Sequence, residues 1–305
     1  MRFVELPGLP PLAKIGLGTW QFGAPEWGYG HAYARGEAAA IVRRALDLGV
    51  TLIDSAEIYG FGRSERIVGE AIADRREQVF LATKLLPVLP LAAVVRRRAH
   101  ASARRLGTRI DLYQLHWPNP LVPLRSTARG LRALQDEGLI AEIGVSNYSL
   151  ARWQRLEAAL GRRVLSNEVE YSLAQPAAER DLIPYAAAHE RLVIAYSPLG
   201  RGLLGGRYSS QRRPRNLARR GYRLFREPVL ERAKPLLGLL REVAEAHDAT
   251  LAQVALAWTI RHPCVVAIPG ASSVAQVEEN TAAADLELGP DEIEALANAG
   301  AVLAR

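Results

Sequence analysis

Four side chains that can move protons or hold charge stand at, or just beyond, the ends of strand-like runs. Asp54, Lys84 and His116 each close a short apolar run, and Tyr59 follows Asp54 by five residues. Because the carboxyl ends of parallel strands meet at one edge, we expect these side chains to share one mouth. Lys84 is one of only three lysines among 39 basic residues. An ammonium differs from the guanidinium used elsewhere because its compact charge and its pKa respond to their surroundings.

Together these residues can form a proton relay aimed at one oxygen atom. A free tyrosine has a pKa of about 10. A nearby ammonium stabilises the phenolate, so Lys84 is expected to lower the pKa of Tyr59 toward neutral pH. Asp54 would keep the ammonium charged and in place, and His116 would donate a hydrogen bond to a substrate oxygen. Each residue alone also has a structural interpretation, as a packed ring, a cap or a turn, but their common placement favours chemistry.

Strand-like runs alternate with amphipathic helical stretches along the whole chain, which is typical of a parallel sheet. Eight runs are present, the number of strands in a (β/α)8 TIM barrel. We predict an α/β fold with one domain over residues 1–305 and a long loop after the seventh strand, roughly residues 200–235. The predicted strands are residues 12–17, 51–54, 79–84, 111–116, 140–145, 164–169, 192–196 and 265–269.

A doubly wound dinucleotide-binding sheet is the main alternative. Such a sheet carries its glycine fingerprint at the first strand-helix turn, where residues 16–21 break the pattern at the last position. The G-x-G-x-x-G match, Gly200 to Gly205, comes after the seventh run instead. Loops after strands seven and eight of a (β/α)8 barrel commonly bind phosphate, so the glycines favour the barrel.

Composition is typical of a cytoplasmic enzyme. The single cysteine, Cys264, excludes an internal disulfide framework and fits a reducing compartment. No run approaches the roughly 18 apolar residues that a membrane span needs, and the beginning of the chain lacks a signal-peptide pattern. We therefore expect no membrane partner. The six histidines form no H-x-H or H-E-x-x-H pair, so we also expect no metal site.

A net charge of +7 raises the question of nucleic-acid binding. The arginines are scattered and no nucleic-acid-binding motif is present, so an arginine-rich solvated surface is favoured and no nucleic-acid partner is expected. Residues 207–226 are the exception: they crowd arginines into a segment with little apolar periodicity. We predict a mobile basic loop that folds over the barrel mouth. A basic binding protein that uses this loop is the alternative.

The chain resembles the aldo-keto reductase family between about Gly16 and Leu286. The resemblance implies a (β/α)8 barrel that uses NADPH to reduce a small-molecule carbonyl, an aldehyde or a ketone, by hydride transfer. Tyr59 would be the proton donor, with Lys84, Asp54 and His116 in the roles given above. The segments that carry the resemblance are Gly16-Leu-Gly-Thr-Trp20, Leu52-Ile-Asp-Ser-Ala-Glu-Ile-Tyr-Gly60, Thr83-Lys84, Leu115-His-Trp-Pro118, Ile143-Gly-Val-Ser-Asn147, Tyr196-Ser-Pro-Leu-Gly-Arg-Gly202 and Ile268-Pro-Gly-Ala-Ser272 with Glu279-Asn280.

The resemblance also implies which residues contact the cofactor and the substrate. Those expected around the substrate are Trp20, Trp27, Tyr59, His116 and Trp117. Those expected around the cofactor are Gly18, Thr19, Trp20, Asp54, Ser146, Asn147, Glu168, Tyr196, Ser197, Leu199, Gly200, Arg201, Gly270, Ser272, Gln276, Glu279 and Asn280.

Two departures from the family pattern concern the cofactor. Gly270, Ala271 and Gln276 occupy positions where many NADPH-dependent relatives place a basic residue, so NADH is kept as an alternative cofactor. Glu168 stands where the resemblance leads us to expect a glutamine that pairs with the nicotinamide carboxamide. A carboxylate accepts hydrogen bonds but donates none. Glu168 is therefore expected to favour the cationic oxidised ring, unless it turns away toward an arginine.

A different class of function is also considered. Some relatives act as cofactor-binding regulatory subunits with slow or vestigial reductase activity. The presence of Asp54, Tyr59, Lys84 and His116 favours an enzyme. No pattern in the sequence specifies an oligomeric state.

Overall fold

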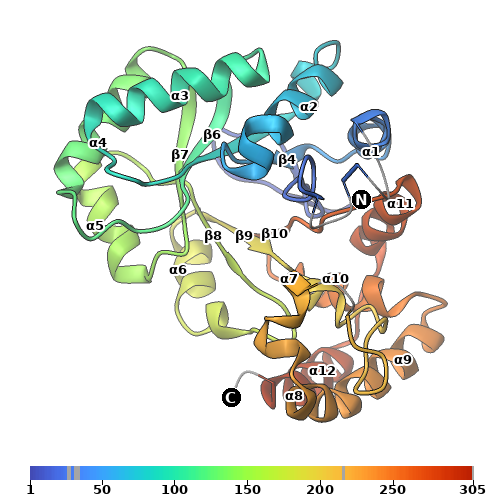
Figure 1. Ribbon diagram of the computed structural model, residues 1–305. Coiled ribbons are helices and arrows are strands. Elements are labelled where there is room, and N and C mark those ends of the chain that lie inside the picture. Colours follow the sequence, from blue (N-terminus) through green and yellow to red (C-terminus); the bar gives the residue numbers. More distant parts are fainter. Residues whose placement is uncertain (26–28, 31–34, 215–216, 304–305) are drawn as a thin grey trace.

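A closed parallel barrel forms the centre of the protein (Figure 1). The computed structural model describes residues 1–25, 29–30, 35–214 and 217–303. Bridges from Ile15 to Ala267 and from Gly18 to Gly270 join the first barrel strand to the last. The predicted (β/α)8 fold is confirmed. In the order of the sheet, the eight strands are β3 (Leu17–Gly18), β4 (Leu52–Asp54), β5 (Phe80–Leu85), β6 (Ile110–Leu115), β7 (Ile140–Ser146), β8 (Ser166–Glu170), β9 (Leu192–Tyr196) and β10 (Val265–Ala267).

Strand residues alternate between the barrel interior and the surrounding helices. Ala82 and Leu112 belong to a small inner cluster, whereas their neighbours Leu81 and Tyr113 belong to the large outer core. Lys84 follows Ala82 by two residues, so it continues the inward row at the carboxyl end of β5. Lys84 is fully buried there, above the apolar interior of the barrel.

A short antiparallel pair, β1 (Phe3–Val4) and β2 (Leu12–Ala13), covers the amino end of the barrel. Val4 and Leu12 join the inner cluster. The predicted first strand, residues 12–17, is therefore wrong as a single element: its beginning pairs with β1, and only its end enters the barrel. A continuous buried apolar run does not distinguish strands of two different sheets.

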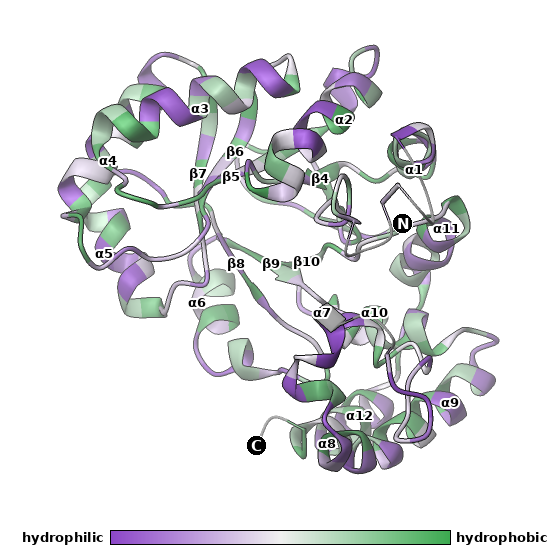
Figure 2. Cartoon of the chain, in the orientation of Figure 1, coloured by the Kyte–Doolittle hydropathy of each residue, from purple (hydrophilic) through white to green (hydrophobic). Residues whose placement is uncertain are grey.

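Amphipathic helices surround the barrel, and hydrophilic and hydrophobic colours alternate along them in Figure 2. Ile41 of α1 and Leu131 of α4 are fully buried against it. The last helix, α12, packs on α9 rather than between two strands. The helices are α1 (Arg35–Asp47), α2 (Arg63–Ala71), α3 (Ala92–Leu106), α4 (Leu124–Asp136), α5 (Leu150–Leu160), α6 (Leu182–Ala188), α7 (Leu217–Arg220), α8 (Glu227–Arg232), α9 (Lys234–Ala246), α10 (Leu251–Thr259), α11 (Val274–Ala282) and α12 (Pro290–Ala301).

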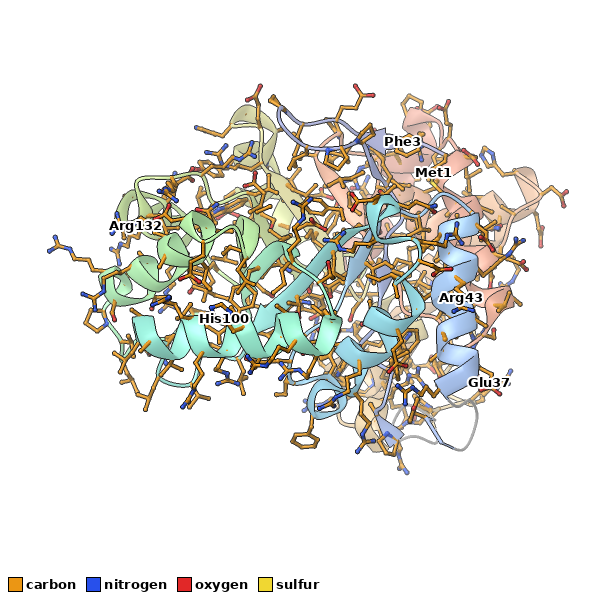
Figure 3. All side chains as sticks on the ribbon, turned by 90° about the horizontal axis from the view of Figure 1, so that it is seen from above. Met1, Phe3, Glu37, Arg43, His100 and Arg132 are labelled. Atoms are coloured by element: carbon orange, nitrogen blue, oxygen red, sulfur yellow. The ribbon has the colours of Figure 1, made fainter. Side chains whose placement is uncertain are left out.

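The long connection after β9 lies where the sequence predicts it, but it contains the short helices α7 and α8. Two of its arginines bond to main-chain carbonyls: Arg213 to Phe225 at 3.1 Å and Arg223 to Leu303 at 2.6 Å. Elsewhere the basic side chains are spread over the outer surface. Figure 3 shows Arg43 on α1 and Arg132 on α4 on opposite sides of the molecule. This dispersion agrees with a solvated arginine-rich surface.

Candidate active site

Lys84 is the centre of a buried cluster at the carboxyl ends of β4, β5 and β8. Its Nζ lies 2.5 Å from Oδ2 of Asp54, 3.1 Å from the carbonyl oxygen of Ser55 and 3.3 Å from the hydroxyl of Tyr59. Oε2 of Glu168 is 3.2 Å from the same Nζ. The structure thus brings together the predicted Asp54, Tyr59 and Lys84, and it adds a second carboxyl group to the ammonium.

The electrostatics of Tyr59 differ from the expectation. Burial is the largest influence and raises the pKa of Tyr59 above its ordinary value. Lys84 lowers this pKa, whereas Asp54 and Glu168 raise it further. The predicted net lowering of the Tyr59 pKa is wrong, because burial outweighs the effect of the ammonium and the two nearby carboxyl groups add to the increase. A raised pKa keeps the phenol protonated at neutral pH, the state that a proton donor needs.

The ammonium and its carboxyl partner are strongly coupled. Burial by itself lowers the pKa of Lys84, but Asp54 and Glu168 more than offset this effect, so the net pKa is raised. For Asp54, burial and then Glu168 raise the pKa, and Lys84 opposes them. The site therefore favours the charged form of Lys84.

His116 lies beside the phenol as a neutral imidazole. Its ring meets that of Tyr59 edge-on at 5.8 Å between centroids and stacks on Trp117 at 3.8 Å. Burial, followed by the charge of Lys84, lowers the pKa of His116 to about 2. A neutral imidazole carries one N–H donor, and Nδ1 is buried without a hydrogen-bond partner among the described residues. The other ring nitrogen, Nε2, is therefore the one that can donate a hydrogen bond to an incoming oxygen.

A hydroxyl network beneath Asp54 was not predicted. The Thr19 hydroxyl lies 2.8 Å from the main-chain oxygen of Asp54 and 2.7 Å from the Ser64 hydroxyl, which is 2.9 Å from that of Ser55. Thr19, predicted as a cofactor contact, is fully buried and is placed by these bonds to support Asp54. Short-range sequence patterns give no signal for Ser64, because it is brought here by the packing of α2.

Glu168 faces Lys84, so the alternative that it turns away toward an arginine is wrong. Its Oε2 also accepts a hydrogen bond from Nε2 of Gln114 at 2.7 Å, and Gln114 in turn accepts from the Ser166 hydroxyl at 3.1 Å. Sequence reasoning missed Gln114. It lies two residues before His116, so the period of two along a strand was a usable signal.

Ser146, Asn147 and Tyr196 form a second polar group on the mouth. The Asn147 amide donates to the Ser146 hydroxyl at 3.0 Å and to the main-chain oxygen of His116 at 3.2 Å. Its Oδ1 accepts from the Tyr196 hydroxyl at 2.9 Å. Asn147 adopts the left-handed conformation, with φ of 60°, a conformation that Asn tolerates better than most residues. These three predicted residues are brought together.

The turn after β9 presents Arg201 to the mouth. Ser197, Gly200 and Arg201 have φ values of 50°, 54° and 59°, so the turn holds two non-glycine residues in a strained region. The Arg201 guanidinium stacks 3.5 Å from the Tyr222 ring centroid and lies 5.6 Å from that of Trp20. Its Nη1 is buried with no partner in the described part of the chain. Leu199, within this turn, is half-buried.

The predicted adenosine-side residues lie on α11 and just before it. The main-chain N–H and the hydroxyl of Ser272 lie 2.8 and 3.2 Å from Oε1 of Gln276. Asn280 is buried beside a small cavity, and Glu279 is half-buried. Gly270 bridges to Gly18 across the closing seam of the barrel. A Cβ at Gly18 would lie 2.7 Å from the carbonyl oxygen of Ile268, so close approach requires this glycine.

Aromatic side chains lie near Tyr59 and His116. The rings of Trp20 and Tyr59 are 6.5 Å apart, and Trp20 and Trp117 remain 39% and 42% exposed. Both therefore present apolar surface that a substrate can cover. Trp27, also predicted here, lies outside the described residues.

Other site types find no support in the part of the chain that the structure describes. No cluster of His, Cys, Asp and Glu there could hold a metal ion. No helix in the described ranges is both long and apolar enough to cross a membrane.

Comparison with known proteins identifies the family. The model of the aldo/keto reductase family matches residues 14–301, so the chain belongs to this family. An uncharacterised oxidoreductase of Mycobacterium tuberculosis is 55% identical over 300 residues, covering 98% of this chain and 93% of that protein. Methylglyoxal reductase of Escherichia coli is 34% identical over 294 residues, covering 96% and 92%.

Solved structures agree with this assignment. An aldo/keto reductase from Klebsiella pneumoniae, crystallised with NADP and acetate, superimposes with a TM-score of 0.78 at 34% identity. The match covers 96% of this chain and 93% of that one.

Proposed function

We propose that this single-domain chain is an NADPH-dependent carbonyl reductase that converts an aldehyde or a ketone to an alcohol, with Tyr59 as the general acid. One observation carries the proposal: the hydroxyl of Tyr59 lies 3.3 Å from Nζ of Lys84, which Asp54 holds at 2.5 Å. A half-buried phenol beside a fixed ammonium can release a proton because the ammonium stabilises the phenolate that remains.

Different residues at the mouth orient the substrate, protonate it and cover it. The neutral imidazole of His116 donates a hydrogen bond to the carbonyl oxygen and orients it beside Tyr59. The phenol then gives its proton to that oxygen as negative charge develops there, and Lys84 stabilises the resulting phenolate. Trp20 and Trp117 cover the apolar part of a small-molecule substrate and exclude water.

The residues present fit a nicotinamide dinucleotide. Its reduced form, when bound, supplies the hydride. The buried, unpartnered Nη1 of Arg201 suits a phosphate oxygen, and the amide and hydroxyls of Asn147, Ser146 and Tyr196 suit a carboxamide. The residues proposed to hold the cofactor are Gly18, Thr19, Trp20, Asp54, Ser146, Asn147, Glu168, Tyr196, Ser197, Leu199, Gly200, Arg201, Gly270, Ser272, Gln276, Glu279 and Asn280.

NADPH is proposed as the cofactor because the Klebsiella pneumoniae relative was crystallised with NADP. Ser272 and Gln276 offer neutral hydrogen-bonding groups, so NADH is the alternative to test. The single buried thiol, Cys264, suits a reducing compartment such as the cytoplasm.

A panel of aldehydes and ketones assayed with NADPH and with NADH tests this function. We expect carbonyl-dependent oxidation of NADPH by the wild type and its loss in Tyr59→Phe. Cofactor binding without turnover of any carbonyl would overturn the proposal and would favour the regulatory-subunit alternative.

A further inference from the structure

Glu168 gives the buried ammonium of Lys84 one carboxyl group more than charge balance requires. Oδ2 of Asp54 and Oε2 of Glu168 lie 2.5 and 3.2 Å from the same Nζ. The side chains of Lys84, Asp54 and Glu168 are 0%, 2% and 3% exposed. Two carboxylates and one ammonium would leave a net negative charge in a site without solvent.

The groups around the pair do not compensate this charge. Facing the pair are Lys84 on β5, Tyr59 in the turn after β4, His116 after β6 and Tyr196 on β9. Burial keeps His116 neutral, because it lowers the pKa of the imidazole to about 2. Burial likewise raises the pKa of Tyr59 and of Tyr196 above the ordinary range, so both phenols are uncharged at neutral pH.

The hydrogen-bond inventory points to the same imbalance. Oε2 of Glu168 accepts from Gln114 at 2.7 Å. Oδ1 of Asp54, in contrast, is buried and has no partner among the residues that the structure describes. An acceptor oxygen buried without a donor is costly, and two carboxyl groups that share one site cannot both ionise easily. The two carboxyl groups lie within hydrogen-bonding reach of each other, so one proton held between them supplies the missing donor and removes one negative charge.

We propose that Asp54 and Glu168 share a single proton in the cofactor-free protein at neutral pH, and that a bound cationic nicotinamide ring expels it. The shared proton makes the site of Asp54, Glu168 and Lys84 neutral. Interacting carboxyl groups of this kind titrate as a pair rather than individually. The second half of the proposal rests on the proposed function, and the first half does not.

The shared proton can be tested without any cofactor by comparing the net charges of wild type and variants by electrophoresis. If the pair holds one proton, Glu168→Gln removes a carboxyl group and its proton together, so the net charge at pH 7 stays the same. Asp54→Asn is expected to behave identically, because Glu168 then ionises alone. The double variant should become more positive by one charge. The control, Glu287→Gln, removes an exposed carboxylate and should also add one positive charge.

Thermal unfolding shows whether each single variant is folded. If one of them is not, the other still provides the test. A shift of one charge in folded Glu168→Gln, equal to that of Glu287→Gln, would show that Glu168 is independently ionised and would overturn the proposal. The same shift in folded Asp54→Asn would do so as well.

Calorimetric titrations in buffers of different ionisation enthalpy test the expulsion. NADP⁺ binding at pH 7 should release about one proton from wild type and none from the pair in Glu168→Gln. NADPH, whose ring is neutral, should release none from the pair in either protein. The preference for NADP⁺ over NADPH should fall by about fivefold or more in the variant, from the loss of one charge contact.

Glu287→Gln is again the control for binding, because it removes a carboxylate from the exposed surface and leaves Glu168 intact. Its NADP⁺ to NADPH preference and proton release should follow wild type. Equal preferences in wild type and Glu168→Gln would refute the coupling to the cofactor. Failure of both cofactors to bind would refute the proposed function and this coupling together, while the charge count would still decide the shared proton.

Discussion

The Nζ of Lys84 lies 3.3 Å from the hydroxyl of Tyr59 at the carboxyl end of the barrel, where the lysine is fully buried and the tyrosine is half-buried. This contact determines how the phenol can act. Burial favours the neutral phenol before the reaction, and the ammonium stabilises the phenolate after the proton has left. The pair therefore suits a proton donor better than a permanently ionised base.

Replacing Tyr59 with Phe should lower carbonyl reduction by about 10²–10⁴-fold, the contribution typical of a general acid. The ring is retained, so packing against Trp20 and His116 should persist. Fluorescence titration with NADPH should give a dissociation constant close to that of wild type, because the proposed phosphate contacts lie elsewhere. Turnover near the wild-type rate in the sequenced variant would rule out Tyr59 as the donor.

The pH dependence of reduction should lack a loss near neutrality. Reduction needs the protonated phenol, which is present below the folded pKa of Tyr59 and disappears as the pH rises through it. Burial raises this pKa above the ordinary value of about 10. His116 is neutral above about pH 2, so its titration does not change the rate in the working pH range. Measured at saturating NADPH, kcat/KM should show no alkaline decline due to Tyr59 below about pH 10. A decline centred near pH 7 would contradict the buried-phenol assignment.

Much of the fold could be predicted from the sequence because its signals are local. Each barrel strand is a short apolar run, and the helices between them have one apolar face, so periodicity indicates the (β/α)8 order. The division of residues 12–17 between two sheets could not be predicted, since both halves are buried and look alike. The packing of α12 on α9 likewise depends on contacts between distant segments.

The site could be predicted where chemistry coincides with a strand end. Asp54, Lys84 and His116 were placed correctly because the barrel brings such ends together. The net pKa of Tyr59 was predicted with the wrong sign, because burial and the carboxyl group of Glu168 are properties of the folded molecule. The stacking of Tyr222 on Arg201 also had no local signal, since these residues are separated by a long connection.

Lys14 should stabilise the amino end of the barrel without affecting catalysis. Its Nζ donates to the carbonyl oxygens of Ile260 and His262, both at 2.7 Å. Lys14→Met leaves these carbonyls without their donor, so urea denaturation should show a loss of about 1–3 kcal/mol in the free energy of unfolding. The control is Lys234→Met, at a side chain that is 53% exposed. It should change the free energy of unfolding by about 0.5 kcal/mol or less.

The stability deficit of Lys14→Met should also depend on pH with a defined sign. Burial, followed by the charge of Arg2, lowers the pKa of Lys14 from 10.5 to about 8. Between these values the unfolded chain binds more protons than the folded protein, so the contribution of Lys14 to stability rises with pH. The difference between wild type and Lys14→Met should widen from pH 8 toward pH 10. A difference that narrows would contradict the lowered pKa.

Cofactor binding should protect the connection after β9 through Arg201. The guanidinium stacks 3.5 Å from the Tyr222 ring centroid, and its buried Nη1 lacks a partner in the described ranges. A phosphate that engages Arg201 would fix this stack by charge-assisted hydrogen bonds. Hydrogen exchange should therefore slow in residues 207–214 and 217–226 when NADPH is added. Arg201→Lys keeps the charge but loses the planar fork, so it should bind NADPH more weakly and, at equal occupancy, show less protection. Identical exchange in wild type with and without NADPH would make this segment a passive part of the surface.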